Sequence, residues 1–476
     1  MTTIKPFFGP PRLSAMRTLA MAISFALLLI FGAGVSIAVS VVTSGVAIAD
    51  DDGGGDDGGD DGGGGSGGGG GGSVTSGGGK DGVKNRPSFR KSIKPKKKVK
   101  RPVRAKKKAK VRRAPRRAAR PTIVALDLGD QALGTLRNAG YAILRDETLT
   151  AAGIRVQQLR LPRNRTLDAA RSEILALGGA AADPNVFYRP QQNADCADEA
   201  ACGARELVAW PTQLGGTCSA DVRIGVVDTR INLAHPALSG QRIETLDLGP
   251  PGRKRSSSNH GTAVVAILAG KAGGVSPGLL PGAQIVHADP YYRASSGGDV
   301  AEVIDIVRSI DALMQRRVGV INLSLAGPAN TVVEEVLRRA NVAGIVAVAA
   351  VGNAGPRAAP QFPAAYEMTV SVTALSSELA VYRRAGQGAH VDFSAPGVAV
   401  EVAEGAKGTV RKSGTSFAVP YIAASLAVIR AGTPSLAVDE SIAQLARTAR
   451  DLGEPGKDTV YGWGLPQLSG ACGGQG

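Results

Sequence analysis

From about residue 205 onward, apolar runs follow one another at short intervals, and this alternation restricts the fold more than any other feature of the chain. The runs are, in order, VRIGVVD, AVVAILAG, QIVHAD, AEVIDIVRSIDALMQ, GVINLSL, TVVEEVLRRANV, GIVAVAAVG and MTVSVTA. Continuous Val-, Ile- and Ala-rich strands that alternate with amphipathic helices are typical of parallel sheets. The sequence therefore predicts an α/β fold with a parallel sheet covered by helices on both faces.

Polar residues stand at the ends of these apolar strands. Asp228 follows VRIGVV, Asn322 and Ser324 lie at and after GVI, and Asn353 follows GIVAVAAVG. In such sheets, sites form at the edge where the carboxyl ends of the strands meet. We therefore expect these side chains to gather at one edge of the sheet.

The stretch SGTSFAVP, residues 413–420, precedes an apolar run with helical spacing, YIAASLAVIR. We expect Pro420 in the first turn of this helix, where a missing N–H costs little. Ser416 then lies at a helix N-terminus, where free N–H groups favour negative charge. Taken alone, the octamer is compatible with a capping serine or with a nucleophile beside donors for an oxyanion.

His260, one of only four histidines, starts a predicted helix of small apolar residues in NHGTAVVAILAG. A serine nucleophile needs such a base, and the base needs a carboxylate to fix its orientation, for which Asp228 is the candidate. A Gly-x-Ser-x-Gly hydrolase is disfavoured, because Ser416 is followed by Phe-Ala. The chain order Asp228, His260, Ser416 is the order found in subtilisins.

Four stretches give the chain a resemblance to the subtilisin-like (subtilase) serine endopeptidases. They are GVVDTRINLAHPAL, NHGTAVVAILAG, AAVGNAG and SGTSFAVPYIAASLA, all within a predicted catalytic domain of residues 205–470. The resemblance implies that Ser416 attacks the peptide carbonyl, that His260 moves the proton and that Asp228 steadies the imidazolium. It also implies that Asn353 and the Ser416 N–H hold the oxyanion, and that protein or peptide substrates are hydrolysed without a cofactor.

The segment INLSLAGP resembles the edge that pairs with an extended substrate in this family, and it supplies five candidate substrate-binding residues: Leu323, Ser324, Leu325, Ala326 and Gly327. Two positions depart from the family pattern. Arg230 replaces the usual Gly after Asp-Thr and puts a charge near the triad, and Phe417 replaces the usual Met after the catalytic serine. No family calcium-site stretch is evident, so any metal, including structural calcium, is left open. His235, His287, His390 and Ser413 are interpreted as structural.

The N-terminal quarter has the composition of non-globular chain. Residues 1–49 combine three basic residues with an uncharged apolar run over 18–49, which predicts either a cleaved signal peptide or a retained membrane anchor with the catalytic domain outside the cytoplasm. Residues 50–79 form a Gly/Asp-rich flexible linker without an EF-hand pattern.

Residues 80–120 hold 21 Lys or Arg and one Asp, so the basic pI of 9.9 comes from this segment, while residues 121–476 are neutral overall. The segment is predicted to be disordered. On an exported chain it is either a solvated spacer or a binder of anionic lipid or cell-envelope polymer. Nucleic acid is a weaker candidate, because aromatic residues for base stacking are almost lacking.

Residues 121–190 predict a small ferredoxin-like α+β unit in the order βαββαβ, with a helix capped by Thr166 and a last strand in DPNVFYRPQ. The resemblance makes this unit similar to a subtilase propeptide, which implies a zymogen with an autoprocessing point between residues 186 and 200. The four cysteines, Cys196, Cys202, Cys218 and Cys472, allow two disulfides in any of three pairings and do not have zinc spacing.

Two other functions remain as alternatives to the exported protease. One is a catalytically inactive subtilase that binds peptides or surfaces. The other is an envelope- or nucleic-acid-binding protein that acts through its basic tail, with a protease attached. The sequence gives neither the substrate preference nor the oligomeric state.

Overall fold

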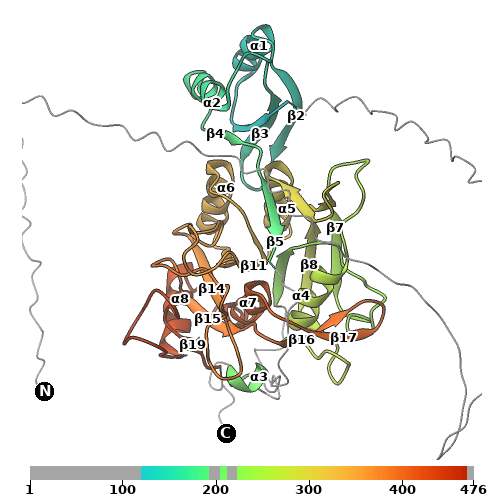
Figure 1. The fold of residues 1–476 in the computed structure, drawn as a ribbon, viewed down its shortest axis with the longest axis vertical. Helices are drawn as coiled ribbons and strands as arrows, with labels where there is room; N and C mark the ends of the chain where they lie inside the picture. Colours follow the sequence, from blue (N-terminus) through green and yellow to red (C-terminus); the bar gives the residue numbers. More distant parts are fainter. Residues whose placement is uncertain (1–119, 192–203, 212–221, 469–476) are drawn as a thin grey trace, which may run out of the picture. The chain divides into compact units, whose positions relative to one another are not determined.

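The computed structural model describes residues 120–191, 204–211 and 222–468, which all belong to one compact unit (Figure 1). The predicted leader, the linker and residues 80–119 of the basic segment lie outside the described residues. So do all four cysteines and residues 192–200 of the predicted processing range.

Seven parallel strands form the central sheet in the order β15-β14-β13-β11-β6-β8-β7, and the predicted parallel α/β fold is confirmed. Their bounds are β6 Arg223–Val227, β7 Ile243–Asp247, β8 Gln284–Asp289, β11 Val320–Leu323, β13 Val346–Ala350, β14 Thr369–Leu375 and β15 Phe393–Pro396. The apolar runs did not predict the two edge strands. β7 alternates polar and apolar residues in IETLD, and β15 is only four residues long.

Helices cover both faces of this sheet (Figure 1). The helix α4 (Asn259–Ala269) and the helix α7 (Thr415–Gly432) share one apolar core, while α5 (Val303–Gln315) and α6 (Thr331–Val342) pack in the other. The helix α8 (Val438–Arg447) packs against α7, and α3 is the short turn Ala204–Leu207. By length and composition α7 could cross a membrane, yet 83% of its apolar window is buried in the protein, as in the core helix of a globular domain.

A second sheet, antiparallel and in the order β2-β3-β1-β4, lies between residues 122 and 184. Its elements are β1 Thr122–Leu126, α1 Asp130–Asn138, β2 Ala142–Leu149, β3 Ile154–Arg160, α2 Leu167–Ala176 and β4 Ala181–Pro184. This is the predicted βαββαβ order, and the Thr166 side chain caps α2 by accepting from the Ala169 N–H at 3.2 Å.

The prediction for the last strand of this unit was wrong in one respect. DPNVFYRPQ does not form a single strand: β4 ends at Pro184, and β5 (Phe187–Pro190) leaves the unit to join a third sheet, β12-β5-β10-β9. The other strands are β9 Tyr292–Arg293, β10 Asp299–Glu302, β12 Leu325–Ala326, the hairpin β16 Val400–Glu404 with β17 Gly408–Lys412, and the pair β18 Ala449–Arg450 with β19 Leu465–Pro466.

Candidate active site

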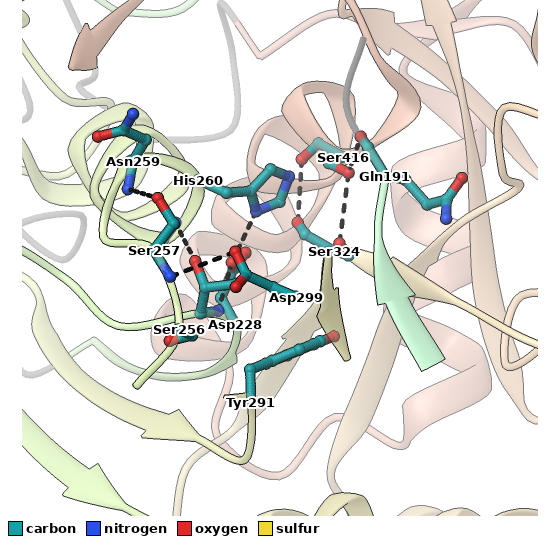
Figure 2. A network of polar contacts seen from close by, with 12 residues as sticks. Gln191, Asp228, Ser256, Ser257, Asn259, His260, Tyr291, Asp299, Ser324 and Ser416 are labelled. Atoms are coloured by element: carbon teal, nitrogen blue, oxygen red, sulfur yellow. Dashed lines mark hydrogen bonds and ion pairs between the residues drawn. The ribbon is translucent and has the colours of Figure 1, made fainter. Parts of the chain in front are cut away.

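The parallel sheet brings three of the predicted site residues to one edge. Asp228 follows β6, Ser324 follows β11 and Asn353 lies three residues after β13. These strands are hydrogen-bonded neighbours that run in the same direction, so their carboxyl ends meet. The starts of α4 and α7 bring His260 and Ser416 to the same place, because Phe417, the residue after Ser416, packs on the His260 ring (Figure 2).

Asp228 and His260 form a buried pair. Asp228 Oδ1 lies 2.6 Å from His260 Nδ1, and each residue is 1% exposed. The Thr229 N–H also donates to Asp228 Oδ1, at 2.7 Å. A carboxylate at this nitrogen favours the tautomer with the proton on Nδ1, which leaves Nε2 as an acceptor. That Nε2 is buried, has no hydrogen-bond partner within the described ranges, and is turned toward Ser416 (Figure 2).

Glycine beside the histidine allows this close approach. A Cβ atom on Gly261 would lie 2.0 Å from the Thr229 carbonyl oxygen, so α4 begins in direct backbone contact with the loop after β6. The Gly261 N–H donates to Thr229 Oγ1 at 3.0 Å and fixes that contact. The His-Gly-Thr sequence therefore places the imidazole against the strand that carries Asp228.

The two departures from the family pattern have different surroundings. The Phe417 ring is fully buried and packs on the His260 imidazole, with 5.6 Å between the ring centroids. Arg230 donates its backbone N–H to Ser256 Oγ at 2.9 Å, and among the described residues its guanidinium forms no ion pair with Asp228.

Ser416 is the second residue of α7 and is fully buried. Its Oγ donates to the carbonyl oxygen of Gln191 and lies 3.3 Å from the Ser324 carbonyl oxygen (Figure 2). The structure shows no hydrogen bond between this hydroxyl and His260 within the part of the chain it describes. The chain's own Gln191 carbonyl therefore forms a hydrogen bond with the hydroxyl of the candidate nucleophile.

The expectation for Pro420 needs correction. Pro420 is the sixth residue of α7, not a first-turn residue, so it withholds an N–H from the Ser416 carbonyl four positions earlier. The Ser324 hydroxyl donates to that carbonyl instead, at 2.9 Å, and accepts from Asn322 Nδ2 at 2.9 Å. Ser324 thus replaces a missing helix hydrogen bond at the candidate nucleophile.

The side-chain amide of Asn353 has a defined orientation. Its Oδ1 accepts from the Thr415 N–H at 3.1 Å and from Thr415 Oγ1 at 3.0 Å, so these two donors place the oxygen on that side. The Nδ2 group is buried and has no hydrogen-bond partner among the described residues. A buried N–H group without a partner beside a helix N-terminus can donate a hydrogen bond to an oxygen that becomes negatively charged during a reaction.

The predicted substrate edge is occupied by the chain itself. β12 pairs antiparallel with β5, with Leu325 opposite Pro190 and Ala326 opposite Arg189. The Gln191 N–H continues the ladder to the Ser324 carbonyl at 3.4 Å. Of the remaining candidates, Leu323 ends β11 inside the central sheet, and Gly327 exchanges two backbone hydrogen bonds with Phe362.

A second buried carboxylate, Asp289 at the end of β8, escaped the sequence analysis. Ser256 Oγ lies 3.0 and 3.3 Å from its two oxygens, and burial raises the pKa of Asp289 to about 7. Ser256 also accepts from the Arg230 N–H and so links the loop before His260 to the loop after Asp228, and Asp289 holds the Ser256 hydroxyl in place. The run QIVHAD ends in an aspartate just as VRIGVVD does, and that signal could have identified it.

The remaining histidines have structural surroundings. His287 is fully buried with Nε2 2.9 Å from the Thr229 carbonyl oxygen, and burial lowers its pKa. His235 Nε2 lies 3.0 Å from the Gly408 carbonyl oxygen. Burial also lowers the pKa of His390. In the described ranges no group of three or more His, Cys, Asp or Glu side chains gathers as metal ligands, and calcium stays open.

Comparison with known proteins places this site in a family context. The model of the subtilase family matches residues 219–464. Subtilisin DY of Bacillus licheniformis is 30% identical over 284 residues, which cover 56% of this chain and 96% of that protein. The minor extracellular protease Epr of Bacillus subtilis (strain 168) is 28% identical over 54% of this chain and 39% of its own length.

Among solved structures, fervidolysin from Fervidobacterium pennivorans superimposes with a TM-score of 0.63 at 21% identity. The match covers 75% of this chain and 62% of the fervidolysin chain. At this identity the likeness establishes a shared fold.

Proposed function

The chain belongs to the subtilase family of serine endopeptidases, and on that premise we propose that Asp228, His260 and Ser416 cleave peptide bonds and that the enzyme is made as an exported zymogen. Subtilases need no cofactor for this chemistry, and their substrates are proteins or peptides. The observation that carries the proposal is the buried Asp228–His260 hydrogen bond of 2.6 Å, which leaves Nε2 as an acceptor facing Ser416.

In the proposed reaction, Ser416 Oγ attacks the carbonyl carbon while its proton moves to His260 Nε2. Asp228 stabilises the imidazolium, and the oxyanion receives hydrogen bonds from Asn353 Nδ2 and the Ser416 N–H. The C–N bond then breaks, and His260 gives its proton to the leaving amine. Water, deprotonated by His260, hydrolyses the acyl-enzyme, releases the acid product and restores the serine hydroxyl.

The zymogen proposal rests on how residues 121–191 contact the catalytic domain. β5 lies along the predicted substrate edge, and the Gln191 carbonyl accepts from Ser416 Oγ. The scissile bond in autoprocessing is then the one between Gln191 and Gln192. This lies inside the range that the sequence allowed.

Polar contacts hold the N-terminal unit on α5 and α6. Arg145 of β2 pairs with the buried Asp305 on α5, and Asp183 of β4 accepts from the Thr331 N–H at the start of α6, at 2.6 Å. A carboxylate at a helix N-terminus is favourable, because the first N–H groups have no partner in the helix. Asn330 already caps α6 by accepting from the Val332 and Val333 N–H groups, and Asp183 adds an acceptor for the Thr331 N–H.

Export is supported by the basic head and apolar run of residues 1–49 and by the similarity to a protease that is named extracellular. Signal peptide or retained anchor, and binding of anionic lipid or envelope polymer through residues 80–120, stay predictions.

Intact mass tests the triad and the zymogen together. The chain from residue 121 onward should lose a fragment that ends at Gln191, whereas Ser416→Ala should stay whole. Ser425→Ala removes another buried serine of α7, one that donates to the Tyr421 carbonyl, and should be processed like the wild type.

Cleavage of the Ser416→Ala chain at the wild-type rate would refute the role of Ser416. Cleavage at another bond would refute the assigned boundary. If the wild type also stays whole, a fluorophosphonate probe decides between the causes: labelling of Ser416 means an active enzyme without self-cleavage, and no labelling means an inactive one.

A further inference from the structure

We propose that this enzyme selects substrates through hydrogen-bonding side chains at two positions, an amide directly before the cleaved bond and a phenol four positions before it. The inference rests on the proposed function, because it takes Tyr188-Arg189-Pro190-Gln191 as a segment bound in the manner of a substrate.

The phenol at the fourth position is enclosed. Tyr188 is 0% exposed within an apolar cluster, and its backbone pairs with Ala301 of β10. A Cβ atom on Gly327 would lie 2.6 Å from Tyr188 Cδ1, so the absence of a side chain there makes room for the ring. This part of the site therefore fits a flat six-membered ring.

The enclosed end of that ring meets polar groups. The Tyr188 hydroxyl donates to the Pro328 carbonyl oxygen at 3.0 Å. The neighbouring Tyr366 hydroxyl is held in place, because it donates to the Asn330 carbonyl and accepts from the Asn330 N–H, both at 2.8 Å. Phenylalanine would fill the same volume but leave the Pro328 carbonyl without this donor, so the site discriminates in favour of tyrosine.

The amide at the first position also has a specific partner. Gln191 Oε1 accepts from the backbone N–H of Asn353 at 3.0 Å, and Gln191 Nε2 donates to the Arg189 carbonyl at 3.3 Å. Asn353 is only 6% exposed, so an apolar side chain at this position would leave its N–H without an acceptor. A glutamate would accept the same bond but would set a carboxylate against the Arg189 carbonyl.

The two middle positions supply matched controls. The Arg189 side chain is exposed and Pro190 is half-buried, and neither side chain donates or accepts a hydrogen bond with the catalytic domain among the described residues. We therefore expect no strong selection for arginine at the third position.

A panel of fluorogenic tetrapeptides tests the inference on the full chain after its own processing. With Tyr-Arg-Pro-Gln as the reference, phenylalanine in place of tyrosine should lower kcat/KM about 5-fold, and leucine or glutamate in place of glutamine about 10-fold. Alanine in place of arginine should change kcat/KM less than about 2-fold. Equal rates for tyrosine and phenylalanine, or for glutamine and leucine, would overturn the proposed selection at that position.

A variant tests the fourth position from the enzyme side. Gly327→Ala places a methyl group against the phenol ring, so kcat/KM for the reference peptide should fall at least about 10-fold more than for the peptide with alanine at the fourth position. An equal loss for both peptides would contradict the assignment of Gly327. Hydrolysis of casein and fluorophosphonate labelling of Ser416 distinguish the specificity proposal from the proposed function. If the enzyme hydrolyses casein and Ser416 is labelled, but the peptides are cleaved without side-chain selection, only the specificity proposal is refuted. If casein is not hydrolysed and Ser416 is not labelled, the proposed function is refuted.

Discussion

Replacing Ser324 with alanine should destabilise the protein by leaving two buried polar groups without partners. The Ser324 hydroxyl donates to the Ser416 carbonyl and accepts from Asn322 Nδ2, both at 2.9 Å, and all three residues are at most 1% exposed. A buried polar group without its partner costs about 1–3 kcal/mol. We therefore expect Ser324→Ala to lower the free energy of unfolding by about 2–4 kcal/mol, allowing for partial relaxation.

The proline in α7 gives this prediction an internal check. Pro420→Ala restores an N–H that can donate to the Ser416 carbonyl within the helix, so Ser324→Ala should cost about 1–2 kcal/mol less when combined with Pro420→Ala. Urea unfolding measures all four combinations, in a Ser416→Ala background that prevents self-digestion and keeps the backbone carbonyl. Ser425→Ala, which orphans no helix carbonyl, should cost under about 1 kcal/mol. If Ser324→Ala costs the same with and without Pro420→Ala, the Ser416 carbonyl is not the group that depends on Ser324.

Three further predictions concern the same edge of the sheet. Asn353→Asp keeps the acceptor oxygen but loses the free donor, so kcat should fall with little change in KM. Removal of the corresponding donor in a subtilisin lowers kcat by about 10²–10³, which sets the scale for this family. The pKa of Asp289 is raised to about 7, so between pH 4 and 7 the folded state keeps a proton on Asp289 that the unfolded state has lost. In the Ser416→Ala background the free energy of unfolding should therefore fall by roughly 2–4 kcal/mol as the pH rises from 4 to 7. Asp289→Asn should make the free energy of unfolding less dependent on pH in urea titrations. Gly261→Ala should unfold the protein or lower its free energy of unfolding by over about 3 kcal/mol, because the new Cβ would lie 2.0 Å from a backbone carbonyl oxygen. Gly134→Ala in α1 has nothing within 4 Å of its Cβ and should raise the free energy of unfolding by up to about 1 kcal/mol. Similar melting temperatures for the two variants would contradict the close contact at α4.

The fold of the catalytic domain could be predicted from the sequence alone, because a parallel sheet covered on both faces requires strands that are apolar throughout. The same pattern marks the strand ends and so identifies Asp228, Ser324 and Asn353 from the sequence. The short edge strands β7 and β15 were not found, since an edge strand is buried on fewer sides and its sequence need not be continuously apolar.

Relations between distant segments were decided only by the tertiary structure. That Pro420 withholds an N–H from the Ser416 carbonyl depends on where α7 begins, and a helix start is set by packing as well as by propensity. β5 pairs with β12 and does not extend the sheet that contains β4. This pairing depends on a strand of the catalytic domain that lies 135 residues away in the chain. A sequence pattern indicates which residues of a segment are buried, so it locates buried strands and the approximate positions of helices. Packing between segments fixes which carbonyl, hydroxyl or amide lies opposite another, so only the folded chain places the Gln191 carbonyl beside the Ser416 hydroxyl.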